Sequence, residues 1–171
     1  MSAQESCNNR PMAGELALDT VDRRILQALQ GQGRITYDEL AAQVGLSASA
    51  ALRRVKRLED AGVIAGYVAL VAPERVGLGL TAYLNVRLAK HTDSQQRSPM
   101  DLFSAAVQSW PEVVECSALT GEMDVLLRVV VQDMAHYSHF VIEQLLKHPS
   151  VHDCKTSFVL RRLKGTTALP V

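Results

Sequence analysis

The chain has no excess of charge of either sign. Its 171 residues include 18 basic and 18 acidic side chains, and the first 75 residues hold nine of each. A positive field over the whole chain is therefore excluded, and any affinity for nucleic acid must come from local clustering of bases. Long hydrophobic runs are also missing, both at the N-terminus and later, so we expect neither an export signal nor a membrane-spanning helix.

Cysteine is scarce as well. Cys7, Cys116 and Cys154 are widely spaced and odd in number, which argues against a disulfide framework and against a CxxC metal or redox site. Reduced thiols fit a cytoplasmic protein, and with 47% apolar and 21% charged residues the composition is that of a folded globular chain.

The residues of common catalytic sites are absent too. No Ser/His/Asp order, paired acid dyad or glycine-rich phosphate loop is evident, so we expect no enzyme activity and no cofactor. His136 and His139 stand three apart, a spacing that can hold a metal ion. Because no carboxylate or CxxC partner follows at ligand spacing, we expect exposed histidines and no metal site.

What the chain does have is a concentrated basic stretch between Leu46 and Ile64. Ser47 is a good N-cap, Gly62 is a good terminator, and an apolar stripe is expected at Leu52, Val55 and Leu58. The outward-facing bases within five residues are Arg53, Arg54, Lys56 and Arg57. A basic run of this kind can also be a solvated helix face.

Two amphipathic helices are predicted before it. The first begins at Asp19 with a second acid three residues on, and Gly31 and Gly33 end it. The second begins at Thr36, and only Gly45-Leu46-Ser47 separates it from the basic helix. Two helices joined by a short glycine-containing turn form a helix-turn-helix, whose second helix enters the major groove of double-stranded DNA.

The first turns of a recognition helix lie nearest the base edges, so Ser47 to Arg54 should supply specificity. Arg53 or Arg54 is suited to a guanine edge, while Ser49 and Ala50 are small enough for close approach, Ala50 to a thymine methyl group. Lys56 and Arg57 are better placed for phosphates.

Beyond the basic helix, Gly66–Val71 is predicted as a strand, and after residue 80 the periodicity changes from 3.6 to 2. Ala82, Leu84, Val86 and Leu88 alternate with more polar residues. Later segments predict a helix up to Trp110, strands at Val113–Leu119 and Val125–Val131, a helix from Met134 to Leu145 and a last strand at Val151–Leu160. The order strand, helix, strand, strand, helix, strand is the ferredoxin-like arrangement, and the fold class is α+β.

One face of that sheet is left without a cover. Tyr83, Val113 and Leu119 are expected on it, and an exposed apolar face promotes association. A two-fold homodimer is the simplest remedy, and it would also give paired recognition helices the symmetry of a palindromic site.

Five stretches in this order resemble the Lrp/AsnC family of bacterial transcription regulators over residues 16 to 170. They are LDTVDRRILQALQGQGRIT, ELAAQVGLS, RRVKRLEDAGVIAGY, TGEMD and TSFVLRRLKGTTALPV. The polar composition of residues 1–17 suggests a flexible arm, and the Pro and Gly residues of 73–80 suggest a linker. The resemblance implies a winged helix-turn-helix (18–72) and a ligand-sensing RAM domain (81–165), followed by a tail (166–171). It also implies dimers, in some members octamers, that bind a free amino acid between subunits.

The same resemblance indicates effector residues. Gly121-Glu122-Met123-Asp124 matches the family's Gly-x-x-Asp turn, although a plain hairpin turn also needs Gly and Asp. We hypothesise that Asp124 accepts hydrogen bonds from the α-ammonium and that turn N–H groups face the α-carboxylate. Positions aligned with those that influence effector response, which are also ordinary core candidates, are Ala118, Met134, Ser157, Phe158 and Val159.

The sequence therefore predicts a cytoplasmic, nucleoid-associated, homo-oligomeric DNA-binding regulator controlled by a small-molecule effector, most simply an amino acid. Two rivals stay open. One is an architectural DNA-binding protein without ligand response, and the other is an enzyme or regulatory subunit built on the ferredoxin-like domain.

Overall fold

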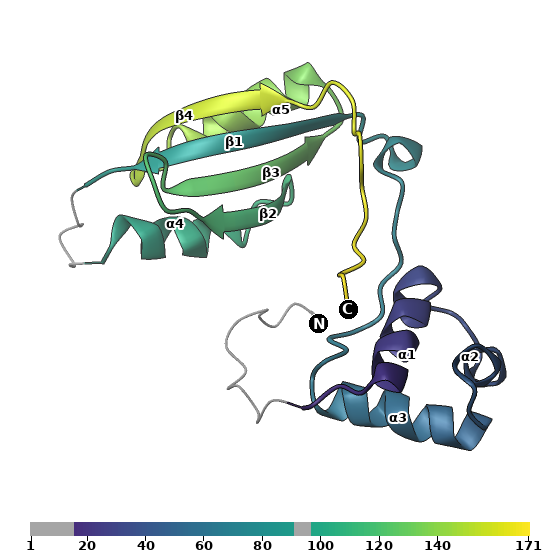
Figure 1. The fold of residues 1–171 in the computed structure, drawn as a ribbon. Helices are drawn as coiled ribbons and strands as arrows, with labels where there is room; N and C mark the ends of the chain where they lie inside the picture. Colours follow the sequence, from purple (N-terminus) through teal and green to yellow (C-terminus); the bar gives the residue numbers. More distant parts are fainter. Residues whose placement is uncertain (1–15, 91–96) are drawn as a thin grey trace. The chain divides into compact units, whose positions relative to one another are not determined.

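The computed structural model describes residues 16–90 and 97–171, and these form two compact units. The first unit contains the helices up to Ala69 together with Gly165–Val171, and the second runs from Leu70 to Lys164 (Figure 1). The predicted arm (1–17) lies largely outside the described residues. No helix in the described part of the chain is long and apolar enough to cross a membrane.

The first unit is built from three helices, α1 (Thr20–Gly31), α2 (Tyr37–Val44) and α3 (Ala48–Asp60). Each begins where a side chain satisfies the free N–H groups of its first turn. Asp19 and Thr36 both form capping boxes with an acid three residues later, and the hydroxyl of Ser47 accepts from the Ala50 N–H at 3.3 Å. Gly45 has φ +73°, which the tight turn between α2 and α3 requires. The predicted helix-turn-helix is confirmed.

The core of this unit differs from the prediction at one position on α3. Ala51, Val55 and Leu58 are each at most 1% exposed and pack against Ile25, Leu40 and their neighbours. Leu52 is 46% exposed, so the expected stripe of Leu52, Val55 and Leu58 is wrong. The small side chain of Ala51 faces the neighbouring helices instead.

The segment after α3 also departs from the prediction. Gly66–Val71 forms no strand, and Val68, Leu70 and Val71 are exposed. A strand needs a neighbour to complete its ladder of hydrogen bonds, and the described residues provide none here. The segment is fixed at Tyr67, whose hydroxyl donates to Glu59 at 2.8 Å.

The predicted tail is part of the first unit and packs on α1. The side-chain amide of Gln30 donates to the Leu169 carbonyl at 3.1 Å and accepts from the Leu169 N–H at 2.5 Å, while Gln27 donates to the Val171 carbonyl at 2.7 Å. Val171 also contacts the helical core. The end of the described chain is therefore held on the DNA-binding unit.

The second unit begins with a short 3₁₀ turn, η1 (Pro73–Val76), and confirms the ferredoxin-like order. Its elements are β1 (Leu80–Leu88), α4 (Pro99–Val107), β2 (Val113–Ala118), β3 (Val125–Val131), α5 (Met134–Phe140), a π-helical turn η2 (Val141–Leu145) and β4 (Val151–Phe158). The four strands are antiparallel in the order β2-β3-β1-β4 (Figure 1).

Both helices of this unit pack on one face of the sheet. Phe103 of α4 and Phe140 of α5 are fully buried against the alternating β1 residues Ala82, Leu84, Val86 and Leu88. The opposite face carries Tyr83, which is exposed, and the ion pair between Arg128 and Glu115. The uncovered face is thus confirmed, but it is more polar than the sequence suggested.

Three details of the predicted sheet are wrong. Val113 packs toward the helical core, because it pairs with the buried Val129. Leu119 lies beyond the end of β2 and is exposed, and Leu160 lies beyond the end of β4 and is almost completely exposed.

Candidate nucleic-acid interface and effector cavity

The side chains of α3 are held on α1 by a buried carboxylate. Asp22 is fully buried, and its two oxygens accept from Arg54 Nη1 at 2.8 Å and from Arg57 Nη2 at 2.5 Å. Arg54 Nη1 also donates to Asp19 at 2.7 Å. Charge-assisted hydrogen bonds of this kind are the stronger ones in proteins, so two of the four bases of α3 support its position on α1.

This network also shifts the pKa values of Asp19 and Arg54. The Asp22 backbone N–H and the Arg54 guanidinium together lower the pKa of Asp19 from 3.8 to about 2. The same contacts with Asp19 and Asp22 raise the pKa of Arg54. Asp19 and Arg54 therefore stay ionised at neutral pH, and the ion pair between them is kept.

The remaining bases of α3 point to solvent. Arg53 and Lys56 are exposed, and neither has an ion-pair partner among the described residues. Ser47 and Ser49 are exposed at the helix start, where their hydroxyls lie 3.2 Å apart, while Ala50 is half-buried. A helix start with exposed hydroxyls and two unpaired cations suits a DNA backbone and its base edges.

The sequence prediction for Arg54 and Arg57 changes in the light of these contacts. A guanidinium that donates to two acids has fewer N–H groups left for guanine, so Arg53 is the better base-contacting candidate. Asp19 and Asp22 were expected only as caps of α1. Their second role is to pair with the arginines of α3. The sequence signal for this role is a pair of acids one turn apart, in a helix that neighbours a basic helix. Which arginine pairs with which acid depends on how the helices pack.

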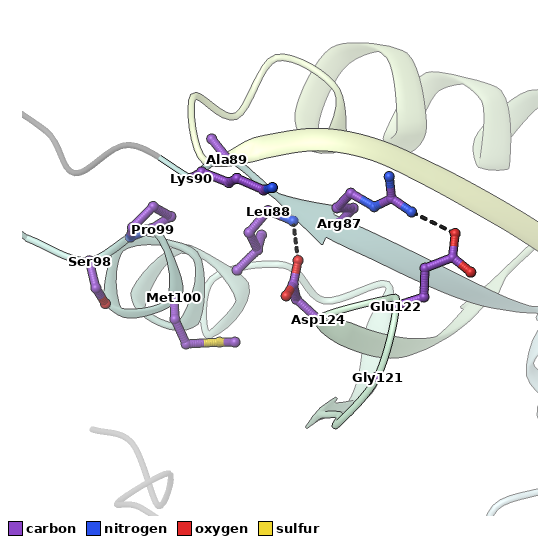
Figure 2. Close-up of a pocket in the computed structure, with 10 residues that line it drawn as sticks. All are labelled: Arg87, Leu88, Ala89, Lys90, Ser98, Pro99, Met100, Gly121, Glu122 and Asp124. Atoms are coloured by element: carbon purple, nitrogen blue, oxygen red, sulfur yellow. Dashed lines mark hydrogen bonds and ion pairs between the residues drawn. The ribbon is translucent and has the colours of Figure 1, made fainter.

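The second unit contains an open cavity of about 740 Å³ at one end of β1. Its walls come from three segments: the end of β1, the start of α4 and the turn before β3 (Figure 2). The lining residues are Arg87, Leu88, Ala89, Lys90, Ser98, Pro99, Met100, Gly121, Glu122 and Asp124.

The turn that forms one wall is fixed to β1 on both sides of Asp124. The Asp124 carboxylate accepts from the Leu88 N–H at 2.7 Å (Figure 2). The Asp124 N–H donates to the Val86 carbonyl at 3.0 Å. Gly121 has φ +118°, a conformation that favours glycine. The Gly-x-x-Asp turn is therefore anchored on β1 at Asp124.

Charged groups of both signs lie in this cavity. Arg87 Nη2 donates to Glu122 at 2.8 Å, while Arg87 Nε is buried and has no hydrogen-bond partner among the described residues. Lys90 supplies a second cation, and Met100 supplies an apolar surface from the start of α4 (Figure 2). Such a mixture suits a small zwitterion with an apolar side chain.

One chain does not bring all the predicted effector residues together. Gly121, Glu122 and Asp124 line the cavity, whereas Met123 is not among the lining residues. Ser157 pairs with Tyr83 and the Val159 N–H donates to Thr81, which places this group at the other end of β1. At about 3.3 Å per residue, Thr81 and Arg87, which lie toward opposite ends of β1, are roughly 20 Å apart.

The other predicted positions divide between the same two ends. Ala118 ends β2 beside the Gly121 turn, and Met134 starts α5 after β3 has passed the Leu80 end of β1. Phe158 packs edge-on against Tyr137, with ring centroids 4.9 Å apart. The sequence did not identify Arg87, Lys90 or the start of α4 as cavity residues, because their approach depends on the register of β1 against β3.

Among the described residues, no cluster of three possible metal ligands occurs. His139 is exposed, as expected, whereas His136 is only partly exposed. His136 lies 3.2 Å from Glu112, and His148 packs against Phe103, where burial lowers its pKa.

Comparison with known proteins assigns both units. The family model for the Lrp/AsnC ligand binding domain matches residues 81–169, and a winged helix-turn-helix DNA-binding model matches residues 18–65. A leucine-responsive regulatory protein of Rhizobium meliloti is 40% identical over 160 residues, which cover 94% of this chain and 100% of the relative. The DNA-binding transcriptional activator DecR of Escherichia coli is 36% identical, covering 90% of this chain and 99% of the relative.

Solved structures agree with the sequence matches. A transcriptional regulator from Neisseria meningitidis, solved in complex with L-Met, superposes with a TM-score of 0.85 at 48% identity and covers 90% of this chain and 97% of its own. An AsnC family regulator from Agrobacterium tumefaciens gives 0.81 at 37% identity, with the same coverage. The chain described here belongs to the Lrp/AsnC family and is a DNA-binding transcriptional regulator with a ligand-binding domain.

Proposed function

We propose that this regulator senses a free amino acid, bound in the cavity beside the Gly121–Asp124 turn, and that the bound effector changes how its α3 helices engage DNA. The observation that carries the proposal is the cavity itself, which presents cations, a fixed carboxylate and an apolar wall within one small space. The L-Met complex of the Neisseria meningitidis regulator supports an amino acid as the ligand class.

Each group of an amino acid has a partner of suitable charge in this cavity. Lys90 and the unpartnered Nε of Arg87 fit the α-carboxylate, in addition to the N–H groups of the turn. One oxygen of Asp124 is occupied by the Leu88 N–H, so its other oxygen is the acceptor for the α-ammonium. Met100 fits an aliphatic or thioether side chain.

The proposal includes a homo-oligomer. The residue group at the far end of β1 (Met134, Ser157, Phe158 and Val159) does not reach the cavity of its own chain, so a second copy would have to bring it there. The uncovered face of the sheet offers a surface for such an assembly, with dimers as the basic unit and octamers as an extension.

The site of action we propose is the cytoplasm, on nucleoid DNA, with no cofactor other than the effector and no catalytic step. An architectural role without ligand response is less well supported, since the family match covers the ligand-binding domain over its whole length in this chain.

A thermal-shift screen of the twenty amino acids, beginning with L-Met, tests the effector. A ligand at 100 times its Kd stabilises the bound state by about 2.7 kcal/mol, which a melting curve detects readily. We expect Arg87→Gln to abolish the shift. Lys147→Gln is the matched control, because Lys147 also has one acid partner, Glu143, but follows η2, away from the cavity and from the uncovered sheet face.

The same variants are then compared on DNA. The effector should change the affinity of the wild type and of Lys147→Gln for the protein's own upstream region, measured at fixed salt, and should leave that of Arg87→Gln unchanged. Absence of a thermal shift with all twenty amino acids would refute amino-acid sensing and favour the architectural role.

A further inference from the structure

Leu52 is an exposed apolar residue in the middle of a helix that does not need it for packing. Ala51, Val55 and Leu58 already fill the contact of α3 with the other helices and are essentially inaccessible to solvent. Leu52 leaves nearly half of its surface in water. A single exposed leucine is common on proteins, so its meaning depends on where it lies.

Leu52 lies on the face of α3 whose side chains are free to contact DNA. Ser49, Leu52, Arg53 and Lys56 follow the i, i+3, i+4, i+7 spacing of one helix face, and all four are exposed. The other flank of α3 is used for support. Ala50, Arg54 and Arg57 follow the i, i+4, i+7 spacing, and both arginines donate to Asp22.

The residue composition of this face differs from that of a solvated helix face. It combines one hydroxyl, two unpaired cations and one large apolar side chain. Ser49, Leu52 and Arg53 lie in the first half of the helix, which faces the groove floor in helix-turn-helix proteins. The major groove has one apolar feature, the C5-methyl group of thymine. A leucine among polar neighbours would find its apolar contact there.

We propose that Leu52 is a specificity-determining residue that contacts a thymine methyl group in the major groove. Leu52 takes this role in place of Ala50, which is half-buried on the Arg54 flank. The inference rests on α3 being the helix that reads DNA. Leu52 would contribute to specificity through shape complementarity and through removal of apolar surface from water. It adds nothing to the charge of α3.

The test removes the methyl group alone. Duplexes that bind the full-length wild type are first selected from a random pool at fixed salt. Each thymine of the selected site is then replaced, one at a time, by deoxyuridine, which lacks only the C5-methyl group. At one position in each half-site we expect wild-type affinity to fall about fourfold, the affinity equivalent of one buried methyl-sized group.

The variant Leu52→Ala completes the comparison. It should bind thymine DNA several-fold more weakly than the wild type and should be insensitive to deoxyuridine at that position. The fold of α3 should be kept, because alanine is the better helix former and Leu52 is outside the core, and circular dichroism checks this. Leu163→Ala is the control, an exposed leucine outside the helices, and should match the wild type on both duplexes.

Two results would overturn the proposal. One is a wild type that loses no affinity at any deoxyuridine position. The other is a Leu52→Ala variant that stays as sensitive to deoxyuridine as the wild type, which would assign the methyl contact to another residue.

Discussion

Replacement of Asp22 by alanine should remove most of the stability of the DNA-binding unit while leaving the second unit intact. The carboxylate of Asp22 is completely buried, whereas the side chains of its partners Arg54 and Arg57 are 29% and 47% exposed. Asp22→Ala takes away the acceptor of two charge-assisted hydrogen bonds and the side chain that closes the capping box on the Asp19 N–H.

The size of the effect follows from these exposures. Breaking a buried ion pair costs about 3 to 5 kcal/mol when the remaining charge cannot reach water. Here both guanidinium groups reach water and Arg54 keeps Asp19, so the low end, about 3 kcal/mol, applies. Loss of the capping interaction adds about 0.5 to 1 kcal/mol. A small domain at roughly 0.05 to 0.15 kcal/mol per residue has only a few kcal/mol in total.

Urea denaturation with two probes measures this change unit by unit. The single tryptophan, Trp110, packs in the core of the second unit, so its fluorescence follows that unit alone. Far-ultraviolet circular dichroism follows all the helices. In Asp22→Ala we expect the helical signal to begin falling at little or no urea, with the Trp110 transition unchanged.

A matched variant separates the buried pair from simple capping. Asp19→Ala removes the N-cap of α1 and an ion pair whose acid is half exposed, which should cost about 1 kcal/mol. Equal destabilisation by Asp19→Ala and Asp22→Ala, or a Trp110 transition that moves with the helical one, would show that the Asp22 network does not hold α3 in place.

Two further predictions concern the effector turn and the segment after α3. Gly121→Ala should destabilise the second unit by about 1 to 2 kcal/mol in urea and weaken effector binding. The reason is the backbone conformation, because φ +118° disfavours any side chain although the space around Gly121 is open. Gly31→Ala is the control and should be neutral, because Gly31 has equally open space and no positive φ. Burial and the hydrogen bond to Glu59 raise the pKa of Tyr67 from 10.0 to about 12, so its contribution to stability is complete below pH 10 and is lost as the pH rises through about 12. Comparison of phenolate absorbance between the wild type and Tyr67→Phe checks this, and a Tyr67 that ionises near pH 10 would refute it.

The elements that were predictable from sequence are those set by local chemistry. Asp19, Thr36 and Ser47 were expected as helix caps, and all three accept the hydrogen bonds of a cap. The alternation in residues 82–88 gave the buried face of β1 correctly, because a strand with one face on a helical layer must alternate. Helix caps and periodicities depend on residues close together in sequence, so they can be predicted without knowledge of the fold.

The predictions that were wrong or incomplete depend on contacts between residues far apart in sequence. Leucine was preferred to alanine for the core stripe of α3, but the close approach of the helices selects the smaller Ala51 and leaves Leu52 outside. Gly66–Val71 has strong strand propensity and no strand to pair with in the described chain. Arg87 enters the cavity only because the register of β1 against β3 sets it beside the turn.

The Asp22 network also limits how this protein can use charge on DNA. Of the four bases of α3, two serve the fold, which leaves Arg53 and Lys56 free in a chain with no net charge. Each phosphate neutralised contributes about 0.9 to the salt slope of binding, so one helix with two free cations gains little affinity from counterion release. In the homo-oligomer we propose, tight binding would come from several α3 helices acting together and from base contacts such as the one proposed for Leu52. Such an assembly would be sensitive to the spacing of its copies, and this spacing is the quantity that the proposed effector would change.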